Sequence, residues 1–378
     1  MKQTETLIIG ASVSGLALAA SLQKKNIQYI IIEKQSQIAS PWRHHYERLH
    51  LHTNKRVSNL PYKKFDSTIP RYPSGKQVVA YLEDYQNEFN INPIFNTEAT
   101  SIWKENNYWV TDTNQGKFIS KYLIMATGAF GKPKPVSIKG MESFPGRIIH
   151  SCEYRSGKDF KGEKVLVVGF GNSACEIAID LYEQAAIPFM SVRSPVNIIP
   201  RDIAGIPILE LSLIMSQLPT RVADTITTLL TRLLFGDITK LGLTKKLYGP
   251  FEEIKKYMTI PSIDIGTVKH IRQGHIKVNG GIDYIKGNNV YFSDGKIEDF
   301  NSIIACIGFN NENARIIAVD KNRFEDLKVC VDKQKNFGED GLYFCGFWIG
   351  STGHIREIAG DALKIAKDIA EKQIDSKA

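Results

Sequence analysis

The sequence has few cysteines and lacks the patterns that cysteines form in redox and metal sites. Its 378 residues include 5 cysteines, and no two of them form a CxxC pair or have metal-ligand spacing. The missing pair excludes disulfide reductases that use two redox-active cysteines. An odd count without a disulfide framework favours a reducing compartment, so we predict a cytoplasmic protein. Cys306 and Cys345 lie in apolar, strand-like runs and are expected in the core.

Dense basic blocks and long apolar runs are also missing. The net charge is +8 and the pI about 9.0, but lysine and arginine are spread along the chain, which argues against nucleic-acid binding. The longest apolar candidate, residues 203–235, is too interrupted to span a membrane. Its charged residues are Glu210, Arg221, Asp224 and Arg232. Three interpretations of this region stay open: two amphipathic helices covering a substrate cavity, a membrane-surface contact, or core packing.

The first strand-like run, Leu7–Ile9, leads into a glycine turn with the sequence GASVSG. In a dinucleotide-binding turn, the first glycine permits the sharp turn, the second lets a phosphate approach the backbone, and the third lets helix and strand pack closely. Gly10 and Gly15 match the first and third positions, but Ser12 replaces the middle glycine. Glu33 ends the next β-rich run, 23 residues after Gly10, where it can accept hydrogen bonds from ribose hydroxyls.

The same pattern returns in the run Lys164–Val168, which leads into the turn GFGNSA. Gly169, Gly171 and Ala174 occupy its three glycine positions. The place of the acidic residue is taken here by Arg193, 24 residues after Gly169. An arginine at this place can bind a 2′-phosphate, which predicts NADPH in preference to NADH. A solvated surface arginine is the alternative interpretation.

Two dinucleotide folds in one chain predict an α/β protein with two Rossmann-like domains. Two further strand-like runs, 122–125 and 302–307, end at glycines where the chain is expected to cross between domains. The run 342–345 and a helix over about 356–372 would complete the first domain, so the second domain is an insertion in the first. The predicted ranges are 1–160 for the first part of the first domain, 161–300 for the second domain with a helical cover, and 301–378 for the return segment of the first domain.

Residues 144–154 fit the pattern FxGxxxHxxxY, which is typical of class B flavin-dependent monooxygenases. Within this class the chain resembles the YUCCA-type enzymes, the indole-3-pyruvate monooxygenases, over nearly its whole length. This resemblance implies that the first domain binds FAD and that the inserted domain binds NADPH. The matching segments are Glu47–His52, Tyr72–Ser74, Lys121–Gly128, VVGFGNSACEIAIDL from Val167, Phe235–Asp237, Leu241–Leu243, Tyr248–Pro250 and Pro261–Thr267.

Three features depart from the YUCCA-type pattern. Ser12 stands at the middle glycine position, and Val13 stands where these enzymes usually have proline. The segment 347–354 is also unlike the usual form. Because that segment is expected to approach the active site, substrate identity is the least firmly implied property.

The resemblance also implies roles for individual residues. His52 is expected near the reactive edge of the flavin, where it would hydrogen-bond the bound peroxide or NADP⁺; a structural histidine is the alternative. His150 and Tyr154 are expected to be structural residues between the domains rather than catalysts. No metal site is predicted. The residues assigned to cofactor binding are Gly10, Ser12, Ser14, Gly15, Glu33, Lys34, Trp42, Arg43, Thr127 and Gly128 for FAD, and Gly169, Gly171, Asn172, Ser173 and Arg193 for NADPH.

The implied activity is that of an NADPH-dependent flavin monooxygenase. Reduced flavin would add O₂ to form a C4a-hydroperoxide, which would oxygenate an aromatic 2-oxo acid such as indole-3-pyruvate with decarboxylation. S- or N-oxygenation of small soft nucleophiles, an uncoupled NADPH oxidase or flavin reductase, and a non-catalytic nucleotide sensor stay open. The expected partners are a small-molecule substrate and O₂, without nucleic acid or a transmembrane segment. Peripheral membrane contact and a homo-oligomer also stay open.

Overall fold

The computed structural model describes residues 1–128, 130–257, 259–310, 316–317, 338–347 and 350–375. The chain divides into two compact units. Unit 1 consists of Met1–Arg43, Thr53–Lys132 and Asn310–Ala378, and unit 2 consists of His44–His52 and Pro133–Phe309. Unit 2 is thus made of two insertions in unit 1. The short one is 44–52, and the long one begins and ends within the short strands β6 (Lys132–Pro133) and β19 (Phe309–Asn310).

Unit 1 is built on a mixed sheet whose strand order is β2-β1-β5-β4-β3. β1, β2 and β20 run parallel to their partners, whereas β3 and β4 are antiparallel. β4 pairs with the start of β5, and β20 pairs with its last residues, so the C-terminal return completes the same sheet. The strands are β1 (Lys2–Ile9), β2 (Tyr29–Ile32), β3 (Ala99–Glu105), β4 (Tyr108–Thr113), β5 (Gly116–Met125) and β20 (Leu342–Phe344).

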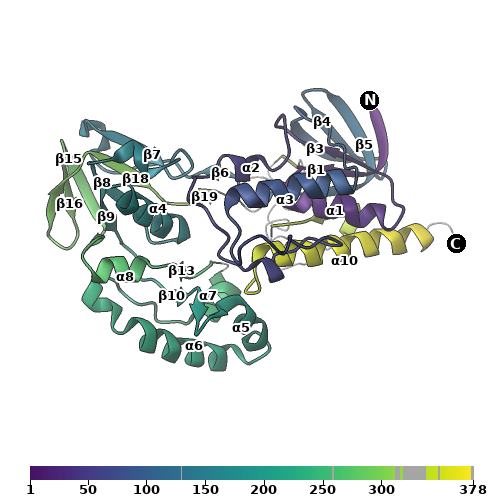
Figure 1. The fold of residues 1–378 in the computed structure, drawn as a ribbon. Coiled ribbons are helices and arrows are strands. Elements are labelled where there is room, and N and C mark those ends of the chain that lie inside the picture. Colours follow the sequence, from purple (N-terminus) through teal and green to yellow (C-terminus); the bar gives the residue numbers. More distant parts are fainter. Residues whose placement is uncertain (129, 258, 311–315, 318–337, 348–349, 376–378) are drawn as a thin grey trace. The chain divides into compact units, whose positions relative to one another are not determined.

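Among the described residues of unit 1, four α-helices accompany this sheet. They are α1 (Val13–Gln23), α2 (Ser40–Arg43), α3 (Gly75–Glu88) and α10 (His354–Asp375). α1 packs against α10, as Figure 1 shows, and all but one of its residues are buried. α3 begins at a capping box in which Ser74 Oγ accepts from Gln77 N and Gln77 Oε1 accepts from Ser74 N.

Unit 2 is built on a five-stranded parallel sheet with the order β14-β9-β8-β18-β7. α4 (Asn172–Glu183) packs against it, and the core beneath this helix includes Val165, Val167, Ile177 and Leu181. A separate antiparallel sheet, β15-β16-β17, follows. The strands are β7 (Arg147–His150), β8 (Lys164–Val168), β9 (Ile187–Ser191), β14 (Lys277–Asn279), β15 (Ile282–Lys286), β16 (Asn289–Phe292), β17 (Ile297–Asp299) and β18 (Ser302–Ala305).

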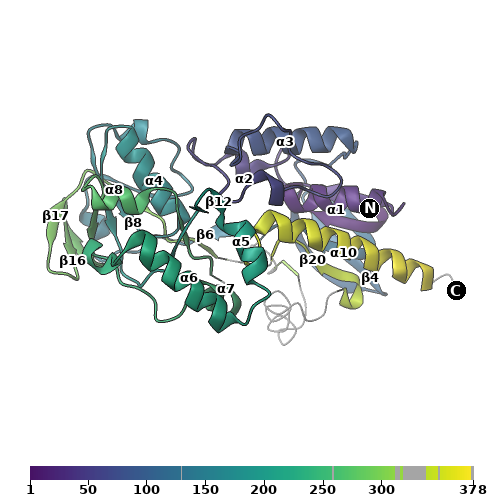
Figure 2. The ribbon, with the colours of Figure 1, turned by 60° about the horizontal axis from the view of Figure 1, so that its bottom comes forward.

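The helical part of unit 2 lies between β9 and β14 in the chain, and Figure 2 shows its helices grouped together. Residues 203–235 contain two helices, α5 and α6, as one of the three interpretations of this region proposed, and their role as a cover of a substrate cavity stays a prediction. No helix in the described part of the chain is both long and apolar enough to cross a membrane. The elements are β10 (Ile198–Pro200), β11 (Asp202–Ile203), β12 (Ile206–Pro207), α5 (Ile208–Met215), α6 (Thr220–Phe235), α7 (Pro250–Tyr257), β13 (Ser262–Asp264) and α8 (Thr267–Arg272).

The division into units differs in position from the sequence-based ranges. β7 pairs with β18, so residues from 133 onward belong to unit 2, whereas the sequence-based range gave them to the first domain. β18 itself lies in the second sheet, although the return segment was expected to begin at 301. Residues 44–52 also belong to unit 2, although the sequence-based range gave them to the first domain. The differences at β7 and β18 have the same cause, because pairing between strands more than 130 residues apart leaves no local sequence signal.

Candidate active site

The glycine turn after β1 depends on two glycines for its shape. Gly10 has φ +105°, and a Cβ atom there would lie 2.8 Å from the carbonyl oxygen of Ala126. A Cβ atom at Gly15 would lie 1.9 Å from the carbonyl oxygen of Gly10. Both positions exclude a larger residue. At Gly10 the residue after β5 lies too close, and at Gly15 the backbone of the turn itself, at Gly10, lies too close.

Ser12, which replaces the middle glycine, is the N-cap of α1. Its backbone is extended (φ −112°), a conformation open to any residue, and its hydroxyl makes no capping hydrogen bond. The first turn of α1 contains no acidic residue. The N–H groups of this helix start are therefore left for an external acceptor, which suits a pyrophosphate. Ser14 is buried against Gly346, where a Cβ atom would lie 2.2 Å from Ser14 Oγ.

Glu33 follows β2 as predicted, and its carboxylate folds back over the glycine turn. Oε2 accepts a hydrogen bond from Ala11 N at 2.8 Å, and Oε1 accepts one from Gln35 N at 2.9 Å. A carboxylate offers about four acceptor positions, so these two bonds leave capacity for ribose hydroxyls. Thr127 and Gly128 follow β5, whose end lies beside the end of β1, and they share this edge of the sheet.

The other residues assigned to the first cofactor lie on or before α2. The Arg43 guanidinium forms an ion pair with Glu83 of α3 at 2.6 Å. Arg43 Nε also donates to the carbonyl oxygen of Ile38 at 3.0 Å. Trp42 precedes Arg43 in the same short helix, and Lys34 is exposed. Arg43 is thus already engaged within unit 1, and its role toward a cofactor stays a prediction.

The glycine turn after β8 repeats the geometry of the first turn. Gly169 has φ +117°, and a Cβ atom there would lie 2.7 Å from the carbonyl oxygen of Cys306. Gly171, the N-cap of α4, has φ −78°, and a Cβ atom there would meet nothing within 4 Å. Unit 2 itself does not require glycine at 171. The open space in front of this backbone, at an uncapped helix start, fits the phosphates of a dinucleotide.

Asn172 and Ser173 begin α4 and connect the turn to other parts of unit 2. Asn172 Oδ1 accepts a hydrogen bond from Ile263 N at 2.8 Å. The Ser262 hydroxyl donates to the carbonyl oxygen of Phe170. These bonds fix β13 beside the glycine turn. The amide oxygen of Asn172 is therefore used within the protein, and its contact with a cofactor stays a prediction.

Arg193 lies two residues after β9 and is exposed. Within the described part of the chain its side chain has no hydrogen bond or ion pair. A Cβ atom at Gly281 would lie 3.0 Å from Arg193 Cγ, so glycine at 281 leaves room for the arginine stem. Val192 N donates to Asn279 O at 2.9 Å and fixes the strand end that carries Arg193. This exposed guanidinium next to the second turn suits a 2′-phosphate.

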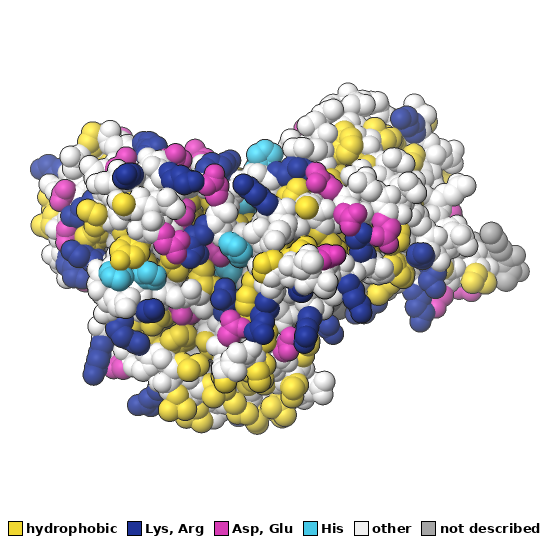
Figure 3. Space-filling model, in the orientation of Figure 1, with side chains coloured by type: hydrophobic (Ala, Val, Ile, Leu, Met, Phe, Trp, Pro, Cys, Tyr) yellow, Lys and Arg dark blue, Asp and Glu magenta, His cyan; other side chains and the backbone are white. Residues whose placement is uncertain are grey.

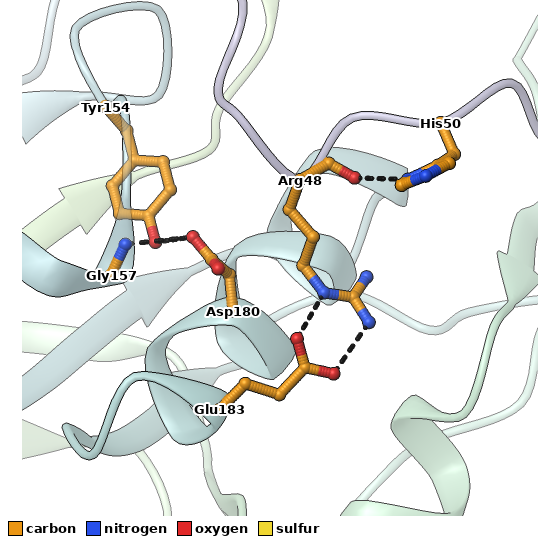
Figure 4. Close-up of polar contacts among 6 residues, drawn as sticks. All are labelled: Arg48, His50, Tyr154, Gly157, Asp180 and Glu183. Carbon is orange, nitrogen blue, oxygen red and sulfur yellow. Dashed lines mark hydrogen bonds and ion pairs between the residues drawn. The ribbon is translucent and has the colours of Figure 1, made fainter. Parts of the chain in front are cut away.

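One face of α4 carries polar side chains at positions 173, 176, 180 and 183, a spacing that places them in a row. The segment 44–52, far away in sequence, docks on this polar row. Arg48 forms a bidentate pair with Glu183, with N–O distances of 2.8 and 2.9 Å (Figure 4). These hydrogen bonds lower the pKa of Glu183 below its usual range. His50 Nδ1 donates to the carbonyl oxygen of Arg48 at 2.7 Å.

The same segment places His52 against Glu176. His52 Nε2 lies 2.6 Å from Glu176 Oε1, and the two side chains are 13% and 1% exposed. Because a carboxylate only accepts, Nε2 carries the proton and Nδ1 is the ring nitrogen left for another partner. Tyr46 faces the same carboxylate and Ser173. Burial, and then the negative charge of Glu176, raise the pKa of Tyr46 well above its usual range.

Glu176 follows Ser173 by one helical turn, so His52 is held close to the glycine turn of unit 2. His52 and Ser173 were predicted from the sequence as site residues, whereas Glu176, Tyr46 and Gly281 were not. The row of polar residues on α4 was the available signal for Glu176. Nothing in the sequence indicated that its partners come from residues 44–52.

Comparison with known proteins identifies the family. A profile described as pyridine nucleotide-disulphide oxidoreductase matches residues 7–198, more than half of the chain. Indole-3-pyruvate monooxygenase YUCCA6 of Arabidopsis thaliana is 35% identical, covering 97% of this chain and 90% of that protein. Indole-3-pyruvate monooxygenase YUCCA4 of Oryza sativa subsp. japonica is 33% identical, covering 98% and 88%. The chain belongs to the YUCCA-type flavin-dependent monooxygenases. Its cofactors are FAD and NADPH.

Solved structures confirm the fold of this YUCCA-type enzyme. A flavin-containing monooxygenase from Stenotrophomonas maltophilia superimposes with a TM-score of 0.71 at 17% identity, covering 99% of this chain and 100% of that one. An open crystal structure of cyclohexanone monooxygenase gives a TM-score of 0.78 at 16% identity, covering 99% and 88%. Both support the predicted pair of Rossmann-like domains, and the division of the chain agrees with the predicted insertion of one domain in the other.

The FxGxxxHxxxY motif of this YUCCA-type enzyme, at residues 144–154, forms structural contacts inside unit 2. His150 Nε2 donates to Gly308 O at 3.1 Å, and His150 Nδ1 accepts from Cys152 N at 3.2 Å. The Tyr154 hydroxyl donates to Asp180 Oδ2 at 2.6 Å (Figure 4). Gly157 N donates to the same oxygen at 2.9 Å. The expected structural role agrees with these bonds, but they lie within one unit.

The described cysteines are unpaired, although the family profile is named after disulphide oxidoreductases. Cys152, Cys175, Cys306 and Cys345 are free thiols. Burial raises the pKa of the Cys306 thiol to about 12 and that of Cys345 well above its usual range. Cys345 is fully buried, as predicted, whereas Cys306 is only partly buried. Cys330 and the residues 348–349 of the divergent segment lie outside the described residues.

Proposed function

We propose that this YUCCA-type enzyme uses NADPH and O₂ to convert an aromatic 2-oxo acid, such as indole-3-pyruvate, into the carboxylic acid shortened by one carbon. The balanced reaction consumes one 2-oxo acid, one O₂, one NADPH and one proton, and releases the acid, CO₂, water and NADP⁺. The observation that carries this proposal is the 33–35% identity to proteins named indole-3-pyruvate monooxygenases over 96–98% of the chain. FAD, when bound, accepts a hydride from NADPH and activates O₂.

Unit 1 would hold FAD by its pyrophosphate. The N–H groups at the start of α1 and the Ser12 hydroxyl face this anion in the proposal, because Ser12 makes no capping hydrogen bond with this helix start. Glu33 would accept hydrogen bonds from the ribose hydroxyls, and Thr127 and Gly128 would line the same sheet edge. Gly10 and Gly15 keep the backbone close enough for this binding.

Unit 2 would hold NADPH in the corresponding way. Gly171 leaves space for the pyrophosphate at the start of α4, with Asn172 and Ser173 beside it, and Arg193 pairs with the 2′-phosphate. His52 would accept a hydrogen bond from bound NADP⁺ through Nδ1, since Nε2 donates its proton to Glu176. Retention of NADP⁺ excludes water from the reaction, and this limits the loss of reduced oxygen as H₂O₂.

The substrate is tested by a screen with the purified, FAD-loaded enzyme. Indole-3-pyruvate, phenylpyruvate, trimethylamine and a thioether are compared by NADPH consumption, H₂O₂ release and product mass. The proposal expects one arylacetic acid per NADPH with a 2-oxo acid. An S- or N-oxide as the main product would replace it with the alternative oxygenation. About one H₂O₂ per NADPH with every compound would indicate an oxidase, and a colourless protein that retains no flavin would indicate a nucleotide sensor.

His52 is tested by the coupling of NADPH to product. His52→Ala removes the hydrogen bond to NADP⁺, which we expect to weaken NADP⁺ retention about tenfold and to raise H₂O₂ release per NADPH. Glu176→Gln keeps a hydrogen-bonding partner for His52 but removes the charge, so its effect should be smaller. Anaerobic flavin reduction by saturating NADPH should stay close to that of the unmodified enzyme in both variants. Unchanged coupling in His52→Ala would remove His52 from the mechanism.

A further inference from the structure

The helical part of unit 2 exposes an unusual number of large apolar side chains. Among the described residues, 11 of the 19 exposed large hydrophobic side chains lie between positions 206 and 260. Figure 3 shows hydrophobic side chains gathered along the lower edge, where α5 and α6 lie in Figure 1. Single exposed apolar residues need no explanation, but a contiguous group of this kind indicates a contact surface. They are Ile206, Ile214, Leu218, Val222, Ile226, Leu229, Leu233, Leu234, Leu247, Tyr257 and Ile260.

The centre of this surface is a stripe on α6 formed by Val222, Ile226, Leu229 and Leu233. Their spacing of four, three and four residues places them in one line along the helix. All four are exposed, and Leu229 and Leu233 reach 58% and 82%. The helix packs against unit 2 through a different side, where Ala223 and Thr227 are buried. The stripe is therefore not the side that holds α6 in the fold, and core packing does not account for it.

Basic side chains border the α6 stripe. Arg221 and Arg232 are exposed, and each precedes a stripe residue by one position, about 100° around the helix from it. Further exposed lysines lie in the segments after α6 and on α7, a helix that packs against α6. These lysines are Lys240, Lys245, Lys255 and Lys256.

Two acidic residues near the α6 stripe are engaged within unit 2. Asp224 accepts hydrogen bonds from Phe251 N and Glu252 N at the start of α7. Glu253 is 1% exposed and pairs with Lys246. Asp237, after α6, is exposed, and Glu252 on α7 pairs with Lys256. The exposed arginines and lysines of residues 221–256 outnumber these acidic groups, so the exposed charge of this part of unit 2 is mainly positive, in a chain whose net charge is +8.

We propose that the α5–α6 face of unit 2 docks on an anionic lipid surface. The stripe side chains would enter the boundary between headgroups and acyl chains, while Arg221 and Arg232 contact lipid phosphates at the edge. A second copy of the chain fits this face less well. In a twofold contact the same patch faces itself, so the basic border would meet another basic border. The proposal does not depend on the substrate or on the role of His52.

The test is co-sedimentation of the full-length, FAD-loaded enzyme with lipid vesicles. Vesicles of phosphatidylcholine mixed with phosphatidylglycerol are compared with vesicles of phosphatidylcholine alone, at low and high salt. We expect binding to the mixed vesicles that weakens in high salt, because the lipid charge contributes to it. Equal or absent binding to both kinds of vesicle would overturn the proposal.

Two sets of variants separate the apolar and the charged contributions. Leu229→Glu and Leu233→Glu should each weaken binding to mixed vesicles by about tenfold or more, since each removes a leucine from the buried area and adds a negative charge. Arg221→Gln and Arg232→Gln should each weaken it about fivefold and should reduce its salt dependence. Leu363→Glu is the matched control, because Leu363 is 44% exposed on α10, outside this surface, and should bind like the unmodified enzyme.

A second copy as the occupant is tested in parallel. Size-exclusion chromatography with light scattering is run on the unmodified enzyme and on Leu233→Glu. A dimer that Leu233→Glu converts into a monomer, together with no vesicle binding, would overturn the lipid proposal. Flavin content and NADPH oxidation should be the same in all surface variants, which shows that they are folded. If Leu363→Glu lost binding as strongly as Leu233→Glu, the surface would not be the one defined here.

Discussion

At the scale of single residues, the two glycine turns show which positions the fold itself requires. Gly10 and Gly169 both have positive φ, and both face the carbonyl oxygen at the end of a neighbouring strand. These two positions require glycine because a Cβ atom would collide with the backbone of the neighbouring segment. The middle position differs, because Ser12 and Gly171 both have negative φ. A side chain at that position is limited by the ligand rather than by the protein, which explains how a serine can stand there.

Substitutions at Arg193 and Gly281 test whether Arg193 binds the 2′-phosphate of NADPH. Arg193→Glu removes a charge-assisted contact worth about 1.5–3 kcal/mol, so KM for NADPH should rise about tenfold to a hundredfold while KM for NADH changes little. Gly281→Ala should act in the same direction but more weakly, because its Cβ would press on Arg193 Cγ from 3.0 Å. Steady-state kinetics with both cofactors measures the change.

The matched control for the Gly281 substitution is Gly360→Ala. Gly360 lies in α10, and a Cβ atom there would meet nothing within 4 Å. This variant should keep the cofactor preference of the unmodified enzyme. Equal changes in the two KM values for Arg193→Glu would contradict the assignment of Arg193 to the 2′-phosphate.

Some of these residues could be predicted from the sequence and others could not, and the difference has a physical reason. Gly10, Gly169 and Glu33 belong to local strand–turn–helix patterns, so their places follow from short-range spacing. Gly281 and Glu176 act through partners about 90 and 120 residues away. Such contacts depend on how β9 and β14 pair, or on where the segment 44–52 docks. Local hydrophobic periodicity predicts neither of these.

At the scale of helices and strands, α10 carries a carboxyl group whose surroundings oppose its charge. Burial is the main cause that raises the pKa of Asp361 from 3.8 to about 6, and the negative charge of Glu357 adds to it. Lys364 acts in the opposite direction. The folded state thus binds a proton at Asp361 more tightly than the unfolded chain does.

This difference predicts how stability depends on pH. Since the folded state holds the extra proton between about pH 4 and pH 6, the contribution of Asp361 is most favourable below that window and is lost as the pH rises through it. Asp361→Asn imitates the protonated form and should avoid this loss. The melting temperature of the variant relative to the unmodified enzyme should therefore increase from pH 4 to pH 6 and stay constant above.

Thermal unfolding of the FAD-loaded enzyme at several pH values measures this dependence. Glu371→Gln serves as the control, because Glu371 is an exposed carboxylate on the same helix. Its melting temperature relative to the unmodified enzyme should change little across the same window. A difference for Asp361→Asn that does not vary with pH would show that Asp361 titrates normally.

The elements were easier to predict than their grouping. The strands before both glycine turns, the helices after them and the final helix lie where the sequence placed them. The unit boundary was misplaced because β7, at 147–150, precedes the second turn in sequence yet pairs with β18 of the same sheet. Hydrophobic periodicity defines an element, whereas membership of a sheet depends on partners far along the chain.

At the scale of the whole molecule, each unit is proposed to hold one nucleotide, and tryptophan distinguishes the two units. Trp42, Trp103 and Trp109 belong to unit 1. Trp348 lies outside the described residues. No tryptophan occurs in residues 44–52 or 133–309, the segments of unit 2. Tryptophan fluorescence therefore follows unit 1, while far-ultraviolet circular dichroism follows both units.

This separation predicts different responses to two ligands during thermal unfolding. A ligand that binds only the folded state at about 100 times its Kd stabilises it by about 2.7 kcal/mol. Excess FAD should raise the midpoint seen by tryptophan fluorescence, because the proposed FAD site lies in unit 1. The compound 2′,5′-ADP carries the adenosine and 2′-phosphate of NADPH. It should raise the midpoint of the part of the dichroism change that does not coincide with the tryptophan transition, which reports the unfolding of unit 2. Arg193→Glu should abolish the second shift and keep the first. If 2′,5′-ADP raised the tryptophan midpoint and FAD raised only the other, the two cofactors would have to be exchanged between the units.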